Sequence, residues 1–140
     1  MKEKMREKAA RYFVENSNCC KSILLAADET WSLQISPDLI AVTDFFPKGM
    51  FSGCTCGALV GAEMVLGIIQ KRNAMAMNPK LANQLYKIFV ATFGSCCCRV
   101  LRKKHSILER LTHEGCKKIT ADTAGILYDL VEKLKNISKC

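Results

Sequence analysis

The chain has 140 residues, nine of them cysteine, and a net charge of +8. A chain of this length can bury a core as one domain, so it does not need disulfide bonds for stability. Its first residues lack the apolar centre of a secretion signal, and its longest apolar stretch, residues 57–69, is interrupted by Glu63 and too short to span a bilayer. We therefore expect a cytoplasmic protein without a membrane span, in which cysteines serve metal binding or redox chemistry more often than structural disulfides.

Apolar residues recur at helical spacing through the whole chain, and no segment shows the alternation of a strand. The spacing predicts a first helix over residues 2–15 and a second helix that begins after Asn18 and ends near Trp31. Pro37 predicts the start of a short helix that ends at Asp44, because proline fits the first position of a helix. The sequence FPKGMFSG that follows predicts a loop.

The second half of the chain continues the helical pattern. Long helices are predicted over residues 55–72 and 79–93, the first of them capped by Thr55. A basic helix follows the sequence GSCCC and ends at Leu111, and the last helix begins after Gly115. No internal repeat or linker divides the chain. We therefore expect an all-α fold, a single-domain helical bundle of about five to six helices that forms one cysteine-rich redox domain over residues 1–140.

Cysteines occur at or beside four of the predicted helix starts. They are Cys19, Cys56, Cys98 and Cys116. The first turn of a helix has unpaired N–H groups and the positive end of the helix dipole, and both favour a thiolate over a thiol. Thiolates attack disulfides and bind metals. If the helix starts converge at one end of the bundle, their thiols would suit an anionic metal–sulfur cluster, whose sulfur atoms need hydrogen-bond donors.

Two glycines follow Cys56 on the predicted helix. Gly57 and Gly61 lie four residues apart and, with Ala58 and Ala62, form a strip with almost no side chain, which lets another backbone or a cluster approach closely. We expect both glycines to border the cofactor, although tight packing between helices explains the strip equally well. Each cysteine taken alone can likewise be a small buried hydrophobic residue.

The order of these motifs resembles the C_GCAxxG_C_C family of redox-active proteins. The matching segments are NCCKSIL, CGALVG, GSCCCRVL and EGCKKI. The resemblance spans nearly the whole chain and implies redox function through Cys19, Cys56, Cys98 and Cys116, while related modules in split-Soret cytochromes imply an iron–sulfur centre. Neighbouring cysteines leave the ligand open at three of the four positions. These neighbours are Cys20, Cys54, Cys96 and Cys97.

From both lines of reasoning we expect a redox-active protein whose four dispersed cysteines bind a [2Fe–2S]-type iron–sulfur cluster for electron transfer. A dithiol/disulfide relay without any metal is the alternative, although the Cys-x-x-Cys sequence of such oxidoreductases is absent. The paired spacing of structural zinc sites is absent as well. Cys20, which should point away from Cys19 on a helix, and Cys140, at the end of the chain, are not expected to be ligands.

Basic residues gather in residues 99–118, where seven Lys and Arg face two Glu and contribute +5 to the net charge. We expect this segment to dock an acidic redox partner protein. A nucleic-acid-binding helix is a second alternative, but no known DNA-binding motif surrounds the segment. His105 and His113 are expected at its surface. Glu63 is out of place in an apolar helix, and we expect it to face solvent or to neutralise a nearby lysine.

Overall fold

The structure is a computed structural model that describes residues 1–139, so the prediction for Cys140 lies outside the described residues. The described chain forms eight α-helices and no strand, and its isolated β-bridge joins Thr55 to Cys97. The all-α prediction is confirmed, but the count of about five to six helices is wrong. Three of the eight helices have only six residues each, too few to show a clear apolar period.

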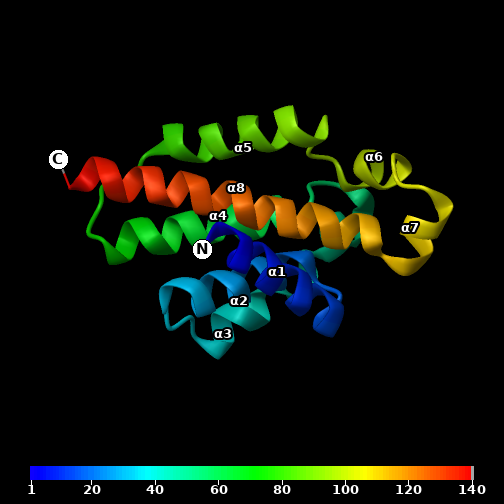
Figure 1. Ribbon diagram of the computed structural model, residues 1–140, viewed down its shortest axis with the longest axis horizontal. Helices are drawn as coiled ribbons and strands as arrows, with labels where there is room; N and C mark the ends of the chain where they lie inside the picture. Colours follow the sequence, from blue (N-terminus) through cyan, green and yellow to red (C-terminus); the bar gives the residue numbers. More distant parts are fainter. Residues whose placement is uncertain (140) are drawn as a thin grey trace.

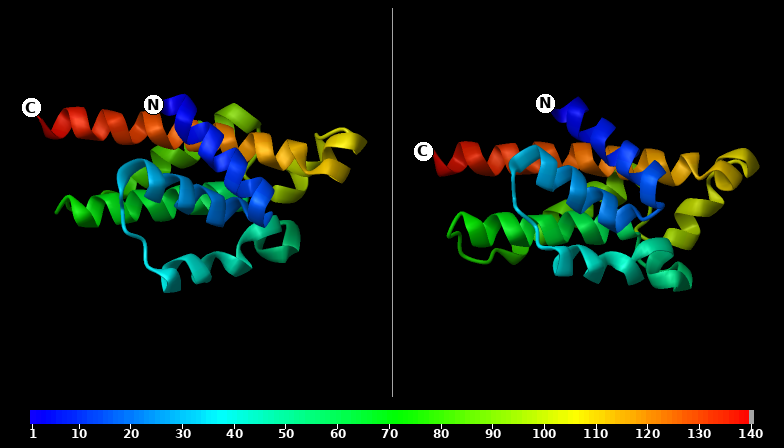
Figure 2. Two further views of the ribbon diagram at one scale, coloured as in Figure 1. Left: turned by 60° about the horizontal axis from the view of Figure 1, so that its bottom comes forward. Right: turned by 90° about the horizontal axis from the view of Figure 1, so that it is seen from below.

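The helices follow one another in this order: α1 (Lys2–Asn16), α2 (Cys19–Trp31), α3 (Pro37–Val42), the turns η1 (Thr43–Phe45) and η2 (Gly49–Gly53), α4 (Gly57–Arg72), α5 (Pro79–Phe93), α6 (Cys98–Lys103), α7 (Ile107–Thr112) and α8 (Glu114–Ser138). The longest helix, α8, runs along the length of the molecule, with α5 on one side of it and α1 and α2 on the other (Figure 1). Figure 2 shows α1 crossing α8, and α2 lying beside α4. None of the described helices combines the length and hydrophobicity needed to cross a membrane.

The core lies where α1, α2, α4, α5 and α8 face one another. Its largest fully buried side chains include Phe89, Met5, Ile23, Leu24, Leu85 and Leu127. Removing such side chains from water provides most of the free energy that holds the helices together. Helix α8 contacts all four of the other long helices, α1, α2, α4 and α5. It therefore positions both ends of the bundle relative to each other.

The basic helix predicted to end at Leu111 is in fact two helices, α6 and α7. The Ser106 hydroxyl accepts a hydrogen bond from the Glu109 N–H at 3.1 Å, and the Glu109 carboxylate accepts one from the Ser106 N–H at 3.3 Å. This reciprocal arrangement is a capping box, which starts a new helix at that point. The Ser-Ile-Leu-Glu sequence carries the signal, so the break could have been predicted.

The segment FPKGMFSG, predicted as a loop, contains the compact turn η2. Four consecutive residues from Lys48 to Phe51 have positive φ angles between 55° and 62°. Only glycine adopts this left-handed conformation without strain, and here three of the four residues carry side chains. Gly49 has a further reason to be glycine, because a methyl group there would collide with the backbone of Cys54.

Glu63 lies half-buried on α4, and among the described residues it has no hydrogen-bond or ion-pair partner. The sequence led us to expect that Glu63 faces solvent or neutralises a lysine, and both expectations are wrong. Burial raises the pKa of its carboxyl from the ordinary 4.5 to about 7, because the apolar surroundings disfavour the charged form.

We expect Glu63→Gln to stabilise the protein at pH 8 and to leave its stability unchanged near pH 4. As pH rises from 4.5 to about 7, the unfolded chain ionises Glu63 while the folded chain keeps the proton, so the wild type loses stability across this window. Because the side chain is only half-buried, solvent screening should reduce the gain to about 1 kcal/mol. Urea unfolding at both pH values measures it. Glu7→Gln, an exposed change on α1, should show no such pH dependence, and equal curves for both variants would contradict the assignment.

Candidate functional site

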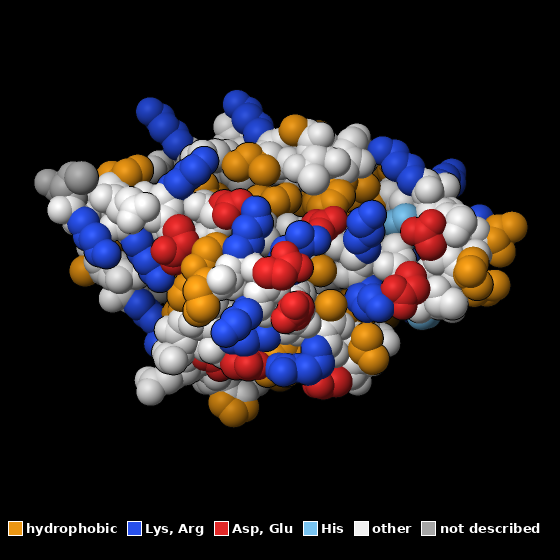
Figure 3. Space-filling view, in the orientation of Figure 1, with side chains coloured by type: hydrophobic (Ala, Val, Ile, Leu, Met, Phe, Trp, Pro, Cys, Tyr) orange, Lys and Arg blue, Asp and Glu red, His pale blue; other side chains and the backbone are white. Residues whose placement is uncertain are grey.

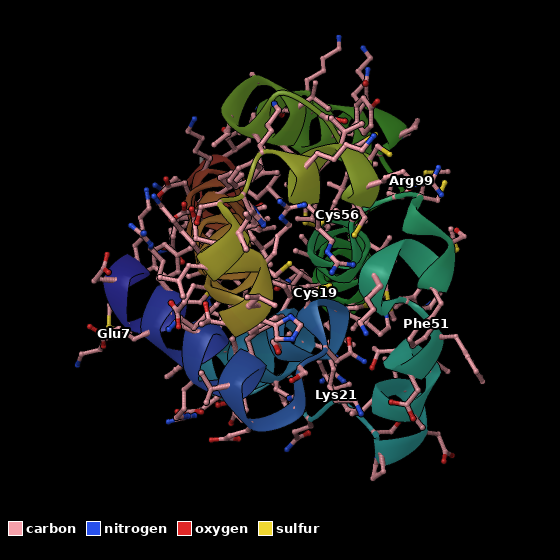
Figure 4. All side chains as sticks on the ribbon, turned by 90° about the vertical axis from the view of Figure 1, so that its right-hand side faces the viewer. Glu7, Cys19, Lys21, Phe51, Cys56 and Arg99 are labelled. Atoms are coloured by element: carbon pink, nitrogen blue, oxygen red, sulfur yellow. The ribbon has the colours of Figure 1, made fainter. Side chains whose placement is uncertain are left out.

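A cavity of about 380 Å³ lies at one end of the bundle, and four cysteines line it. Cys19 is the first residue of α2, Cys56 directly precedes α4, Cys98 is the first residue of α6, and Cys116 lies in the first turn of α8. Figure 4 looks toward this end of the molecule, with Cys19 and Cys56 near its centre. The structure therefore brings together the four cysteines that the sequence placed at helix starts.

Two cysteine-rich segments lie side by side and position half of this site. The Cys56 N–H donates to the Cys96 carbonyl at 2.8 Å, the Cys98 N–H donates to the Cys54 carbonyl, and a β-bridge joins the residues between them. This short antiparallel pairing holds the start of α4 against the start of α6. As a result, Cys56 and Cys98 enter the same cavity although they are far apart in the sequence.

The Cys19 sulfur lies against Gly57, next to Cys56, and the two thiols influence each other's pKa. The Cys56 thiol, acting as a hydrogen-bond donor, lowers the pKa of Cys19, and backbone N–H groups of Cys20, Lys48 and Cys19 itself add to the effect against the opposing influence of burial. The N–H groups of Cys19 and Cys20 lie in the first turn of α2, where N–H groups have no partner within the helix, and Asn18 caps this helix by accepting from the Lys21 N–H at 2.9 Å.

The pKa of Cys56 moves in the opposite direction. Its hydrogen bond to Cys19 and its burial both raise the pKa well above 9, and the negative charge of Cys19 raises it further. The opposite directions of these two shifts favour Cys19 over Cys56 as the thiolate of the pair.

The other two thiols of the cavity keep their protons more firmly. Burial raises the pKa of Cys116 to about 11, and the charges of Cys19 and Cys98 raise it as well. Burial also raises the pKa of Cys98, while the nearby charge of Arg102 opposes the shift. Without a metal, both groups are thiols near neutral pH, and binding a metal would release their protons.

The other cysteines in the described part of the chain do not line this cavity. Cys20 is fully buried, with its sulfur atom 3.8 Å from that of Met64, and burial raises its pKa to about 12. Cys97 donates to a backbone carbonyl at 3.2 Å, Cys96 lies 3.6 Å from a tyrosine hydroxyl, and Cys54 is exposed. Of the neighbouring cysteines that the sequence left as alternatives, none lines the cavity, so each segment contributes one cysteine to it.

The two motif glycines have different neighbours. A methyl group at Gly57 would lie 2.5 Å from the Cys19 sulfur, so this glycine leaves room for the thiol. A methyl group at Gly61 would lie 2.7 Å from the backbone oxygen of Cys20, so this glycine lets α2 pack closely on α4. Neither glycine is among the residues that line the cavity, and the contacts of Gly61 are those of the helix-packing alternative rather than of a cofactor site.

Cationic side chains that the motif analysis missed surround the sulfur atoms. Lys48 and Arg102 line the cavity, and neither forms an ion pair within the described residues, whereas Lys21 pairs with Asp44 at 2.6 Å. The cavity is therefore positively charged, which favours thiolates or another anion. Lys48 comes from the turn before η2 and Arg102 from α6, two segments that are far apart in the sequence. No short sequence motif therefore contains both residues.

The two histidines of the basic segment differ in position. His113 is exposed, as expected, but it also lines the cavity at the start of α8. His105, expected at the surface, is half-buried beside Gly115, where a methyl group would collide with its ring. Burial lowers the pKa of His105, so its ring is neutral at pH 7.

The donor set decides which groups the cavity can hold. In the region 1–139, no three His, Cys, Asp or Glu side chains are grouped closely enough to hold a single metal ion. Four thiols around a cavity nevertheless match the ligand set of a [2Fe–2S] cluster, whose own iron and sulfide atoms occupy the space between the ligands. Cys19 and Cys56, which line this cavity side by side, are the candidate pair for a disulfide.

A family model described as "Putative redox-active protein (C_GCAxxG_C_C)" matches residues 17–130 of the chain. This match includes all four cysteines of the cavity and extends from the cap of α2 into the second half of α8. No curated protein and no solved structure was found to match the chain.

Proposed function

The chain belongs to the C_GCAxxG_C_C family of redox-active proteins, and from this premise we propose that the cavity lined by Cys19, Cys56, Cys98 and Cys116 is its redox centre. We propose further that the four thiols hold a [2Fe–2S]-type cluster for electron transfer. The observation that carries this proposal is the convergence of four thiols from four separate segments on one cavity. A [2Fe–2S] cluster needs four such ligands, and bound here it would supply one-electron chemistry.

The surroundings of the thiols support this proposal. The lowered pKa of Cys19 favours the thiolate, the form that binds iron, and the N–H groups of helix starts can donate to sulfur. Lys48 and Arg102 would offset the negative charge of the cluster. Since the other thiols lose protons on binding, uptake should improve as pH rises. We place this chemistry in the cytoplasm, where a reducing environment keeps thiols free.

A dithiol relay is the second candidate, and the Cys19–Cys56 pair favours it. In this reaction the Cys19 thiolate attacks a disulfide of a partner, which forms a mixed disulfide and releases one partner thiolate. Cys56 then loses its proton to that thiolate and attacks the Cys19 sulfur, which releases the second partner sulfur as a thiolate that takes a proton from water. The partner gains two electrons and leaves as a dithiol, while Cys19 and Cys56 become a disulfide.

Anaerobic reconstitution with iron and sulfide tests both candidates. If the cluster proposal is correct, the desalted protein should retain about two iron and two sulfide per chain and absorb visible light. A chain alkylated with iodoacetamide beforehand is the control and should retain neither. A protein that binds no iron but loses two hydrogen masses for each reversible disulfide on mild oxidation would instead support the relay. If neither result is obtained, the cysteines are simply small buried side chains.

We also propose that an acidic protein partner docks on residues 99–118, whose basic side chains are largely exposed. Helix α7 presents the apolar side chains Ile107, Leu108 and Leu111, each at least 70% exposed. In Figure 3, hydrophobic side chains gather at the end of the molecule where Figure 1 shows α7. An apolar centre with a charged rim is typical of transient protein interfaces. Retention by duplex DNA with a steep salt dependence would favour nucleic acid instead.

A further inference from the structure

A second cavity, of about 420 Å³, opens beside the cysteine cavity and has a strongly basic lining, with no acidic residue. We call it the basic groove. Its cationic residues are Lys48, Arg99, Arg102, Lys103 and Arg110. Lys48, Arg102 and Cys98 line both cavities, so a molecule in the basic groove would lie against the mouth of the cysteine site.

The cations of the basic groove lack acidic partners. Nine ion pairs are formed within residues 1–139, and none involves a residue of this groove. The acids that are nearby in the sequence are engaged elsewhere, because Glu109 caps α7 and Glu114 pairs with Lys117 at 2.7 Å. Five like charges around one hollow repel each other, so a bound anion would relieve this repulsion.

One wall of the basic groove is held in place before any ligand binds. Arg99 donates to the Ser52 carbonyl at 2.9 Å, and its side chain packs on Gly53, where a methyl group would lie 3.1 Å from its Nε. The left-handed turn of η2 also presents Lys48 and Phe51 to the groove. Figure 4 shows Arg99 and Phe51 on the same side of the cysteines. Holding these groups in advance lowers the entropy cost of binding.

We propose that the basic groove binds a small phosphate-bearing molecule with at least two linked phosphate groups. Three of its five cations are arginines, whose planar guanidinium groups match phosphate oxygens with paired hydrogen bonds. The volume of about 420 Å³ falls within the range of small-molecule sites. Phe51, which is 62% exposed, offers apolar surface to the remainder of the ligand. The proposal goes beyond the redox centre and does not depend on what the cysteines hold.

Titration calorimetry with inorganic pyrophosphate and tripolyphosphate tests this proposal. Lys103→Gln combined with Arg110→Gln removes two cations that line the basic groove and not the cysteine cavity. The matched control combines Lys80→Gln with Lys87→Gln on α5, which changes the net charge equally but lies outside both linings. Wild type and control should bind both probes, and the groove variant should bind at least about tenfold more weakly. Circular dichroism checks that all three proteins remain helical.

Several results would overturn the proposal. Equal weakening in the groove variant and its control would show an effect of net charge alone, and the absence of binding to wild type would leave no site. Tighter binding of a polyglutamate peptide or of duplex DNA than of tripolyphosphate, lost in the groove variant, would assign the groove to a macromolecule. Iron uptake by the groove variant should match wild type, so failure of this proposal and failure of the redox proposal are observed separately.

Discussion

Replacing Cys98 or Cys116 with serine should reduce the iron bound after anaerobic reconstitution from about two atoms per chain to background. Each of these residues contributes the thiol of a separate segment to the cavity, and no other described cysteine lines the cavity to replace it. Serine has nearly the same size as cysteine, but its hydroxyl stays protonated at neutral pH and binds iron poorly. The fold should therefore persist while the cluster is lost.

The neighbouring cysteines provide the matched controls. Cys54→Ser changes an exposed residue, and at Cys97 a serine hydroxyl can donate to the same carbonyl as the thiol, so both variants should keep the full iron content. Loss of iron from both controls, or retention of iron in Cys98→Ser and Cys116→Ser, would contradict the ligand assignment.

Serine variants of the cavity cysteines also distinguish the iron–sulfur cluster from the dithiol relay. In the dithiol relay, Cys19→Ser should abolish the reversible disulfide, because Cys19 and Cys56 are the proposed pair and influence each other's pKa most strongly. Cys98→Ser and Cys116→Ser should leave that disulfide intact. In the cluster proposal, by contrast, all of these variants lose iron. Iron content and free thiol measured on one set of proteins therefore decide between electron transfer through a cluster and exchange of disulfides.

Gly61→Ala should destabilise the protein by about 2 kcal/mol, although alanine favours a helix more than glycine does. The added methyl group would lie 2.7 Å from the Cys20 carbonyl oxygen and 3.1 Å from the Ile23 Cβ, so α2 would have to move away from α4. Backbone atoms cannot rotate out of the way as a flexible side chain can. Urea unfolding followed by circular dichroism measures the change.

Gly67 on the same helix is the control for this change. It is exposed, and a methyl group there meets no atom within 4 Å, so Gly67→Ala should stabilise the protein by about 0.5–1 kcal/mol. The two substitutions are chemically identical and differ only in what faces the glycine. Equal effects at Gly61 and Gly67 would show that the close approach of α2 does not exist.

Local sequence was sufficient for most helix starts. Asn18 and Asn78 both precede helices, and their side chains accept hydrogen bonds from the first turns of α2 and α5. Capping depends on residues within one turn of each other, so a short sequence window contains the whole signal. For the same reason, placing Cys19 at a helix start required no knowledge of the fold. The capping box at Ser106 was equally readable, and overlooking it led to the wrong prediction of one basic helix.

Other features could not be predicted from short windows. The left-handed conformation of Lys48, Met50 and Phe51 is unfavourable for these residue types, so it depends on contacts formed with the rest of the chain. The positions of Arg102 and His113 beside the cysteines depend on how the α6–α7 segment folds back onto α8. No spacing in the sequence encodes such contacts.

By itself, the sequence determined the helical class, most of the helix starts and the presence of a cysteine at four of them, because each depends on neighbours along the chain. Only the tertiary structure decided that these four helix starts share one cavity while Cys20 is buried outside it and Cys54 is exposed. Gly57 and Gly61 likewise look equivalent in the sequence, yet one faces a thiol and the other a helix backbone. Which of two similar residues faces the site depends on the angle at which the helices cross. That angle is set by side chains from distant segments that pack together in the core.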